Sequence, residues 1–401
     1  MRIGMLADLY RPHISGVTIH IDLVRKALEE RGHEVYVFTF GERQPEDDER
    51  VIRSSGFSLR VRQQSLSFNF RHDRHARYLL THMDVLHTHH PFISGQLALL
   101  YGKPWGIPIV FTNHTRYDLY MRAYLPLLPP ALGDTLLRTY LPRFCRDIDA
   151  VVAPSPGVQA MLERLGVDVP IHVIPNGIDL SRFRRAVKPV DRGRWGWSSE
   201  DVVFVYLGRL GPEKNLTFLL RAFAAVAQVH PNARLLLMGD GPERSNLEAQ
   251  ATFMGLAERV HFTGLVPYED VPAHLAACDV FATASLTEVH PLSVIEAHAA
   301  GLPVAAVRAP GVEDVVRHEV TGFLVEEDPA ALAAAMGRLV SEPDLRRRMA
   351  RAARERAQEY DVQRTAQRLE ELYTRLQARR AQFRPSWSLR LRRWWMVKMN
   401  R

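Results

Sequence analysis

Two glutamates lie eight positions apart in the stretch TEVHPLSVIEAHAAGLPV, which begins at Thr287. Pro291 suits the first helical position because its missing N–H would have no partner there anyway. The helix then runs through LSVIEAHAA and ends at Gly301, a typical capping residue. Glu288 is therefore expected on the loop before the helix, and Glu296 inside it.

This spacing favours carboxylates that accept hydrogen bonds from hydroxyl groups over a glycosidase pair. The two carboxyl groups of a glycosidase lie about 5 to 9.5 Å apart, whereas eight residues of helix rise about 12 Å. Glu288 would accept from a sugar and Glu296 from a ribose. The backbone N–H groups of Leu292 and Ser293, at the positive end of the helix, favour a phosphate. Two solvated glutamates on an amphipathic helix are the structural alternative.

Two cations follow a predicted buried strand in YLGRLGPEKNL, residues 206–216. Arg209 and Lys214 flank a Gly-Pro turn in this stretch. Fixed cations on such a loop are able to neutralise a diphosphate leaving group, the task that a metal ion performs in other enzymes. Taken alone, the two residues fit an ordinary surface turn better, so this hypothesis depends on the motifs around them.

The elements that must position these residues alternate along the chain. Short apolar runs indicate buried strands, and segments such as HIDLVRKALEERG indicate helices that end at a glycine. The first strands are RIGMLA, EVYVFTF, VLHTH, IPIVFT and AVVAPS, and the alternation restarts at DVVFVYLG. The pattern predicts an α/β fold with two doubly wound Rossmann-like domains that face a central cleft, with ligands at the carboxyl ends of the strands.

The same pattern predicts where the domains begin and end. Segment 176–198 is rich in Pro, Gly and Arg and indicates a linker. We expect an N-terminal domain over 1–180 and a C-terminal domain over 181–350. Helices over 351–382 should pack back across both domains, followed by a basic aromatic tail over 383–401.

Composition limits the class of protein. The chain has 401 residues, 46% of them hydrophobic, which suffices for sizeable cores. Cys145 and Cys278 are the two cysteines, too few for a disulfide framework and without zinc-ligand spacing, so a reducing compartment is expected. No signal-peptide pattern and no apolar run of about 18 residues occurs, so we expect a cytoplasmic protein. The net charge is +7, and the nine lysine and arginine residues after Glu371 are more than enough to account for it.

Several motifs follow one another in a fixed order: GRLGPEKN, MGDGPE, HFTGLVPYEDVPAHLAACDVFATAS, the two glutamates and GLPV. In this order they resemble the retaining family-four glycosyltransferases of the GT-B fold, over the chain up to about residue 375. The resemblance implies that Arg209 and Lys214 hold the diphosphate of a nucleotide-sugar donor. It also implies that Glu288 contacts the transferred sugar and Glu296 the ribose. The C-terminal domain would bind this donor and the N-terminal domain the acceptor.

The N-terminal half shows two further resemblances to this family. DLYRPHISGV is similar to its first loop, where Gly16 lets the backbone approach the donor and acceptor closely. FTNHTRYDLY is similar to its histidine loop, with His114 able to hydrogen-bond the sugar. Pro291 is a departure, because the family usually has Gly there, and it removes one backbone donor for the phosphate.

Three signals for other functions are set aside. His87, His89 and His90 lie at a strand end with alternating direction and no nearby carboxylate, so we expect no metal site. Asp147 and Asp149 form a D-x-D at the entry to a strand, which we interpret as structural. The first strand lacks G-x-G-x-x-G, which disfavours a nicotinamide-dependent dehydrogenase.

Basic and aromatic residues gather in two segments and indicate contact with an anionic membrane surface. The tail SWSLRLRRWWMVKMNR interleaves tryptophan with arginine, and LRVRQQSLSFNFRHDRHARY is a second basic segment. A solvated tail and an ordinary surface helix are the alternatives. The residues expected at the membrane are Arg60, Arg62, Arg392, Arg393, Trp394 and Trp395.

The sequence therefore predicts a retaining hexosyltransferase that needs no metal or cofactor, with a nucleotide diphosphate sugar as co-substrate. We expect glucose as the sugar and a membrane lipid such as diacylglycerol as the acceptor, because residues 87–120 are similar to the branch that glycosylates diacylglycerol lipids. A soluble or polyisoprenoid-linked acceptor is the first alternative. A protein that binds nucleotide sugars or nucleic acid without catalysis is another, but the charge is confined to a tail, so nucleic acid is not expected as a partner.

Overall fold

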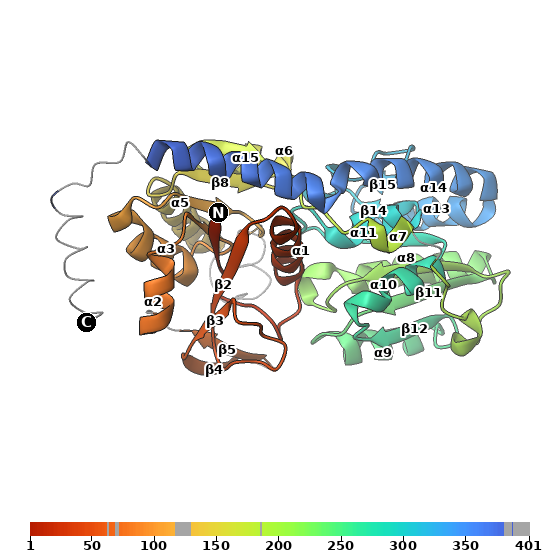
Figure 1. The fold of residues 1–401 in the computed structure, drawn as a ribbon. Coiled ribbons are helices and arrows are strands. Elements are labelled where there is room, and N and C mark those ends of the chain that lie inside the picture. The colour runs from red at the N-terminus through yellow and green to blue at the C-terminus, as the bar shows by residue number, and fades with distance from the viewer. Residues whose placement is uncertain (62–63, 69–71, 117–129, 185–186, 381–386, 388–401) are drawn as a thin grey trace. The chain divides into compact units, whose positions relative to one another are not determined.

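The computed structural model describes residues 1–61, 64–68, 72–116, 130–184, 187–380 and 387. The chain divides into two compact units (Figure 1). Unit 1 holds the described residues of 1–114, 127–177 and 362–401, and unit 2 holds those of 115–126 and 178–361.

Unit 1 is built on a parallel sheet that has seven strands in the described part of the chain. The strands are, in spatial order, β3 Val51–Ser54, β2 Glu34–Phe40, β1 Arg2–Leu6, β6 Val85–Thr88, β7 Ile109–Thr112, β8 Ala150–Ala153 and β9 Ile171–Val173. All neighbouring strands pair in parallel. Every residue of β6, β7 and β8 is buried, as expected for strands whose two faces are both covered.

Helices connect the strands of unit 1. They are α1 Gly16–Glu30, α2 Arg74–Leu80, α3 Ile93–Gly102, η1 Lys103–Trp105, α5 Pro130–Cys145, α6 Pro156–Arg164 and α15 Val362–Arg380. A capping box between Ser15 and Thr18 fixes the start of α1, because each side chain bonds the other residue's backbone N–H. The C-terminal helix α15 packs against α1, which brings the end of the described chain back onto its first helix (Figure 1).

An antiparallel hairpin of β4 Phe57–Val61 and β5 Gln64–Phe68 interrupts the alternation in unit 1. Sequence periodicity did not reveal it, because we interpreted this region only as a basic segment. Arg60 lies on β4, and Arg62 lies outside the described residues. The expected membrane residues Arg392, Arg393, Trp394 and Trp395 also lie outside them.

Unit 2 repeats the architecture on a parallel sheet with six strands in the residues that the structure describes. In spatial order they are β12 Val260–Gly264, β11 Ala233–Met238, β10 Val202–Leu207, β13 Val280–Thr283, β14 Val304–Val307 and β15 Gly322–Val325. The connecting helices are α7 Ser181–Arg184, η2 Arg192–Trp195, η3 Pro212–Lys214, α8 Leu216–Val229, α9 Arg244–Phe253, η4 Tyr268–Asp270, α10 Val271–Ala276, α11 Leu292–Ala300, α12 Pro310–Glu313, α13 Pro329–Ser341, α14 Pro343–Ala357 and η5 Gln358–Tyr360.

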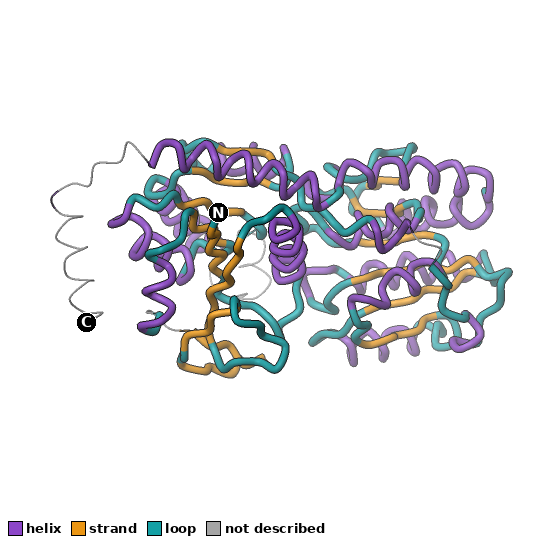
Figure 2. Tube along the Cα trace, viewed as in Figure 1, coloured by secondary structure: helices purple, strands orange, loops and turns teal. Residues whose placement is uncertain are grey.

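The central strand of unit 2 shows why its apolar run is continuous. Val202, Phe204 and Tyr206 of β10 join a core cluster with side chains of α8 and α13. Val203 and Val205 point to the opposite face because successive side chains of a strand alternate, and they are buried as well. Figure 2 shows helices alternating with strands throughout the unit. The predicted α/β fold with two doubly wound parallel sheets is confirmed.

The junction between the units differs slightly from the predicted one. It falls between residues 177 and 178, rather than 180 and 181. Part of the segment interpreted as a linker packs into unit 2: Ile178, Leu180 and Trp197 are buried, and the Ile178 N–H donates to the Tyr360 carbonyl oxygen. Many of the other described residues of the segment are exposed.

The helices near the C-terminus divide between the two units. Helix α14 packs on α11 and α13 within unit 2, and α15 belongs to unit 1. Among the described residues, we find no helix with the length and hydropathy that crossing a bilayer requires.

Candidate functional site

The loop after β10 holds both predicted diphosphate cations. Arg209 follows the strand directly, and Lys214 ends the short helix η3. The buried Tyr206 hydroxyl donates to the Arg209 carbonyl oxygen at 3.1 Å, which fixes the loop on its own strand. A neighbouring loop lies so close that a Cβ on Gly239 would sit 2.0 Å from the Gly208 carbonyl oxygen. Only glycine fits there, so the MGDGPE motif has a packing reason.

Both cations are paired with carboxylates. Arg209 Nη2 lies 2.6 Å from Glu213 Oε1, and Lys214 Nζ lies 2.6 Å from Glu288 Oε1. Glu213 is almost completely buried, and the Thr287 hydroxyl donates to its carbonyl oxygen at 3.4 Å. The two loops that carry the four charged side chains are therefore tied together within unit 2.

The pairing with Lys214 determines the charge of Glu288. Burial raises the pKa of this carboxyl, but the charge and hydrogen bond of Lys214 and the Ser285 hydroxyl together leave the pKa below its ordinary value. Glu288 is therefore ionised at neutral pH and pairs with Lys214. The loop of Glu288 is also packed tightly, because a Cβ on Gly311 of α12 would lie 2.3 Å from the Glu288 carbonyl oxygen.

Helix α11 begins at Leu292, and no side chain caps its N-terminus. Pro291 takes the cap position and not the first helical position, one residue earlier than we expected. The predicted donors Leu292 and Ser293 are the first two helical residues, so their N–H groups belong to the positive end of the helix. Gly301 ends the helix with a φ of 82°, as predicted.

Glu296 is buried inside α11 beside two residues that the sequence did not single out. The Arg182 guanidinium lies over the ring of Tyr268, 4.0 Å from its centre. Burial raises the pKa of Glu296 to about 7, although the Tyr268 hydroxyl and the Arg182 charge act against this rise. Glu296 Oε1 and the Tyr268 hydroxyl are buried and close enough to influence one another, but neither makes a hydrogen bond of ordinary geometry in the described structure. Such atoms are suited to bind the hydroxyl groups of a ligand.

The predicted residues of unit 1 lie around a histidine cluster. His114 follows β7, and its Nε2 lies 2.9 Å from Nδ1 of His89, which follows β6. His20 of α1 contacts His114 with ring centres 4.8 Å apart. Gly16 is the first residue of α1, and a Cβ placed on it would meet no described atom within 4 Å. Packing inside unit 1 therefore does not explain a glycine at this position.

Of the three histidines in the expectation of no metal site, the structure brings only His89 into a cluster with suitable spacing, together with His20 and His114. One ring nitrogen each of His20, His89 and His114 lies within 4.8 Å of the others. His87 is not part of this group, because its two nitrogens bond the Tyr373 hydroxyl at 2.6 Å and the Thr112 hydroxyl at 2.7 Å. The sequence pattern missed the cluster because His20 comes from a distant helix.

The structural interpretation of the D-x-D pair is confirmed. Asp147 pairs with Lys103, and Asp149 accepts a hydrogen bond of 2.8 Å from the Ile109 N–H. Cys145 and Cys278 are free and buried, and burial raises the pKa of Cys145 to about 12, so both act as inert core thiols.

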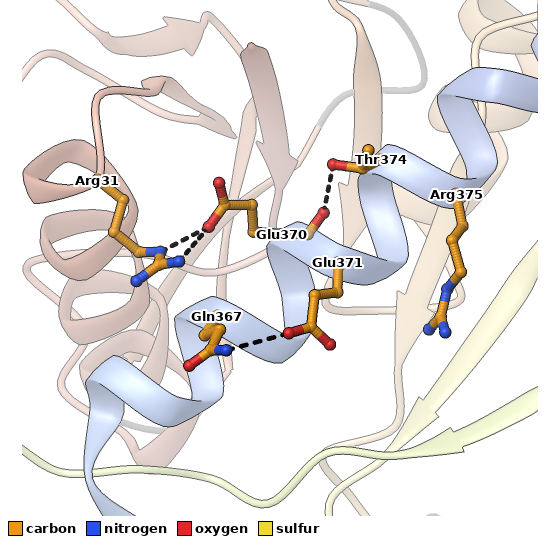
Figure 3. A pocket seen from close by; sticks show the side chains of 6 residues that line it. All are labelled: Arg31, Gln367, Glu370, Glu371, Thr374 and Arg375. Carbon is orange, nitrogen blue, oxygen red and sulfur yellow. Dashed lines mark hydrogen bonds and ion pairs between the residues drawn. The ribbon is translucent and has the colours of Figure 1, made fainter.

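A hollow of about 460 Å³ lies beside α15 in unit 1 and is lined by none of the predicted site residues. Figure 3 shows its side chains, which largely bond one another: Arg31 pairs with Glu370 at 2.5 Å, and Gln367 donates to Glu371 at 3.1 Å. Charges that already satisfy one another leave little for a ligand, so the hollow is not assigned a function.

Sequence comparisons place both units in known families. Residues 14–182 match the model of Glycosyltransferase Family 4, and residues 187–356 match that of Glycosyl transferases group 1. An alpha-monoglucosyldiacylglycerol synthase of Streptococcus pneumoniae is 30% identical over 86% of this chain and 80% of its own length. A D-inositol 3-phosphate glycosyltransferase of Saccharomonospora viridis is 32% identical over 72% of this chain and 69% of its own.

Solved structures agree on the fold. Sucrose-phosphate synthase from Thermosynechococcus elongatus superposes with a TM-score of 0.76 at 24% identity, over 94% of this chain and 99% of the other. Anabaena HepE in complex with UDP and glucose gives 0.73 at 22% identity, over 93% and 99%. Together with the two family matches and the paired charges after β10, these findings show that the chain belongs to glycosyltransferase family 4 and has the GT-B fold.

Proposed function

We propose that the protein is a retaining hexosyltransferase that moves glucose from uridine diphosphate glucose to a membrane lipid such as diacylglycerol, without a metal ion. The observation that carries this proposal is the ion pair between Lys214 and Glu288, four residues before the uncapped start of α11. It joins a cation for the diphosphate to a carboxylate for the sugar.

When the donor binds, its diphosphate replaces the Glu288 carboxylate as the anion paired with Lys214. A diphosphate carries more negative charge than a single carboxylate and also interacts with the N–H groups at the start of α11, so it competes for Lys214. Glu288 is then released from Lys214, and its oxygen atoms turn to hydroxyl groups of the transferred sugar. Donor binding thus converts a resting ion pair into two separate contacts with substrate.

The transfer step follows from the charges. When the bond from sugar C1 to the phosphate oxygen breaks, negative charge grows on the diphosphate, where Lys214, Arg209 and the start of α11 stabilise it. The acceptor hydroxyl attacks C1 from the face that the diphosphate leaves, and a phosphate oxygen takes its proton. The new C1–O bond keeps the configuration of the donor, and the nucleoside diphosphate departs.

Two observations support a nucleoside diphosphate sugar. Glu296 and Tyr268 offer buried oxygen atoms that make no hydrogen bond of ordinary geometry and are suited to a ribose. HepE, a structural neighbour at 22% identity, has been solved with UDP-glucose. Uridine and glucose are the donor components that we propose on this basis, with His114 hydrogen-bonding the sugar.

A lipid acceptor is supported by the names of two relatives. Alpha-monoglucosyldiacylglycerol synthases of Streptococcus pneumoniae and Acholeplasma laidlawii are each 30% identical to this chain. The basic, tryptophan-rich tail has the composition of a segment that binds an anionic bilayer. We therefore propose a peripheral protein on the cytoplasmic face of the membrane.

A soluble phosphorylated acceptor is the second candidate, because the Saccharomonospora viridis relative at 32% identity is named for inositol 3-phosphate. It differs from diacylglycerol in charge as well as solubility. The two acceptors therefore make opposite demands on the site, and one experiment separates them.

The test is a transfer assay with purified protein and a panel of nucleotide sugars. Each donor is offered with diacylglycerol in detergent micelles, with inositol 3-phosphate, or with no acceptor, and released UDP and the product's anomeric configuration are measured. The proposal predicts UDP release that depends on diacylglycerol and an α-linked product. Release that depends only on inositol 3-phosphate would replace the acceptor, and an inverted product would overturn the retaining mechanism.

A further inference from the structure

We propose that His20, His89 and His114 form a binding site for one divalent transition metal ion, and that metal bound there inhibits sugar transfer. The inhibitory part rests on the proposed function, because it assumes that His114 contacts the sugar. The binding part does not. The site lies entirely within unit 1, on α1 and at the carboxyl ends of β6 and β7.

The geometry is close to that of a three-histidine site. One ring nitrogen from each residue lies within 4.8 Å of the others, and the closest contact is 2.9 Å between His89 Nδ1 and His114 Nε2. Ligand nitrogens around a tetrahedral zinc ion are separated by about 3.3 Å, so ring shifts on the order of 1 Å would complete the site. Three protein ligands leave a fourth position open for water or a hydroxyl group.

Unpartnered nitrogens provide an independent reason to expect a ligand. His20 Nδ1 and His89 Nε2 are buried and have no hydrogen-bond partner in the described structure. The two side chains are 3% and 0% exposed, so bulk water does not satisfy them. A buried polar atom without a partner is unfavourable, and a metal ion bound to either of these two nitrogens would supply the missing partner.

The ligand type limits which metal ions fit the site. All three candidate ligands are imidazole nitrogens, and a neutral imidazole binds metal through its lone pair. Neutral imidazoles suit Zn²⁺, Co²⁺, Ni²⁺ and Cu²⁺, whereas Mg²⁺ prefers oxygen ligands.

Surrounding residues hold the ligands in place. His87 stacks on His89 with ring centres 4.4 Å apart, and His87 is itself fixed by the hydroxyl groups of Tyr373 and Thr112. This packing favours a defined orientation of His89, which a metal site requires. A metal ion bound to the His114 ring would compete with the hydrogen bond that this ring is proposed to make to the sugar, so we expect transfer to fall as the site fills.

Cobalt titration tests the site without any assay of activity. The full chain, treated first with a chelator and then freed of it, is titrated with Co²⁺ and followed by visible absorption, and Zn²⁺ is added to displace the cobalt. We expect one Co²⁺ per chain, with displacement by Zn²⁺ and not by Mg²⁺. Absence of a saturable signal in the unmodified chain would overturn the site.

Variants assign the ligands. Loss of an outer-shell partner alone weakens metal binding about 10- to 100-fold, so His20→Ala and His89→Ala should each weaken Zn²⁺ binding by about 100-fold or more. His82→Ala changes an exposed histidine of the same unit and should bind like the unmodified chain. Circular dichroism checks folding, and His20→Gln replaces His20→Ala if that variant does not fold. Unchanged zinc affinity in folded variants at both positions would contradict the assignment.

Zinc inhibition is then measured on the same variants. Each variant is compared with its own rate in the presence of a chelator, and added Zn²⁺ should lower the rate of the unmodified chain but not that of His20→Ala or His89→Ala. If cobalt binds and zinc does not inhibit, the site stands and its inhibitory role falls. If no donor and acceptor pair supports transfer, the proposed function fails while the cobalt signal still reports the site.

Discussion

The side chains proposed to act in transfer differ in charge between the two units: those of unit 2 are charged and ion-paired, and that of unit 1 is an imidazole. In unit 2, Lys214 and Glu288 form an ion pair at 2.6 Å, and Arg209 pairs with Glu213 in the same way. In unit 1, the half-buried His114 belongs to a cluster of imidazoles, and burial lowers its pKa further below neutrality. A resting ion pair responds to an incoming anion by exchanging partners, whereas a neutral imidazole offers a hydrogen bond or a lone pair. The difference supports the proposal that unit 2 binds the leaving group and that unit 1 binds uncharged hydroxyl groups.

The largest expected effect comes from removing the cation of unit 2. Lys214→Ala removes a group that stabilises charge growing in the transition state, so transfer should fall by about 10²-fold or more. Steady-state measurement of UDP release gives kcat and KM for this variant. Lys103→Ala, which removes a half-exposed lysine paired with Asp147, is the matched control and should be near normal.

The folding of the Lys214 variant needs its own control, because Glu288 is left without its partner. The double variant Lys214→Ala with Glu288→Gln removes the remaining charge and should recover thermal stability, but not transfer. If Lys214→Ala alone transferred sugar within threefold of the normal rate, as judged against about 10²-fold expected loss, the diphosphate assignment would be wrong.

A smaller loss is expected in unit 1. His114→Ala removes one hydrogen bond between uncharged groups, which contributes about 0.5 to 1.5 kcal/mol, so transfer should fall by about tenfold at most. The measurement is kcat/KM for the donor, with His82→Ala as the control. A loss as great as that of Lys214→Ala would break the contrast between the units, because it would require charge or proton transfer at His114.

Glu296 provides a pH test inside unit 2. Its pKa is about 7 in the folded protein and 4.5 in its ordinary state, so the folded protein binds this proton more tightly than the unfolded chain does. Its contribution to stability is therefore present below pH 4.5 and is lost as pH rises through about 7.

Glu296→Gln does not titrate, so this decline should disappear. The variant should gain on the order of 1 to 3 kcal/mol relative to the unmodified chain between about pH 5 and about pH 8. Urea unfolding at the two pH values measures the difference, and Glu355→Gln on the exposed side of α14 is the control. Transfer should fall less than it does in Lys214→Ala, since an amide still accepts a hydrogen bond. If the free energies of unfolding of the two chains changed with pH in the same way, the pKa of Glu296 would not be raised to about 7.

The smallest expected effect on turnover comes from the tail, which holds none of the residues proposed to take part in transfer. Deleting residues 384–401 removes six cations and three tryptophans. Each cation near an anionic surface contributes about 1 kcal/mol, so binding to anionic vesicles should weaken strongly. Turnover on acceptor dispersed in detergent should not change. Sedimentation with vesicles and the detergent assay separate the two effects, and a truncated chain that still sediments would remove the tail from the account.

Much of this structure was predictable because parallel sheets leave a clear sequence pattern. Strands buried on both faces are continuous apolar runs, and their carboxyl ends collect the functional loops. Arg209, Lys214 and Glu288 were all predicted, and the structure brings them together after β10 and before α11. The ion pairs that these residues form were not predicted. Glu213 pairs with Arg209 of its own loop, and Lys214 pairs with Glu288 of another loop.

The sequence did not predict contacts that depend on the orientation of a helix about its own axis. His20 was hidden in the amphipathic pattern of α1, which indicated burial but not that the buried face meets His89 and His114. Arg182 reaches Tyr268 across 86 residues of sequence. A short-range pattern does not determine such long-range neighbours.

The most direct test of the central claim is a crystal structure with UDP bound. We expect the β-phosphate to lie within hydrogen-bonding distance of Lys214 Nζ and of the N–H groups of Leu292 and Ser293. Glu288 should no longer be paired with Lys214. A diphosphate bound elsewhere, with the 2.6 Å ion pair between Lys214 and Glu288 intact, would contradict it.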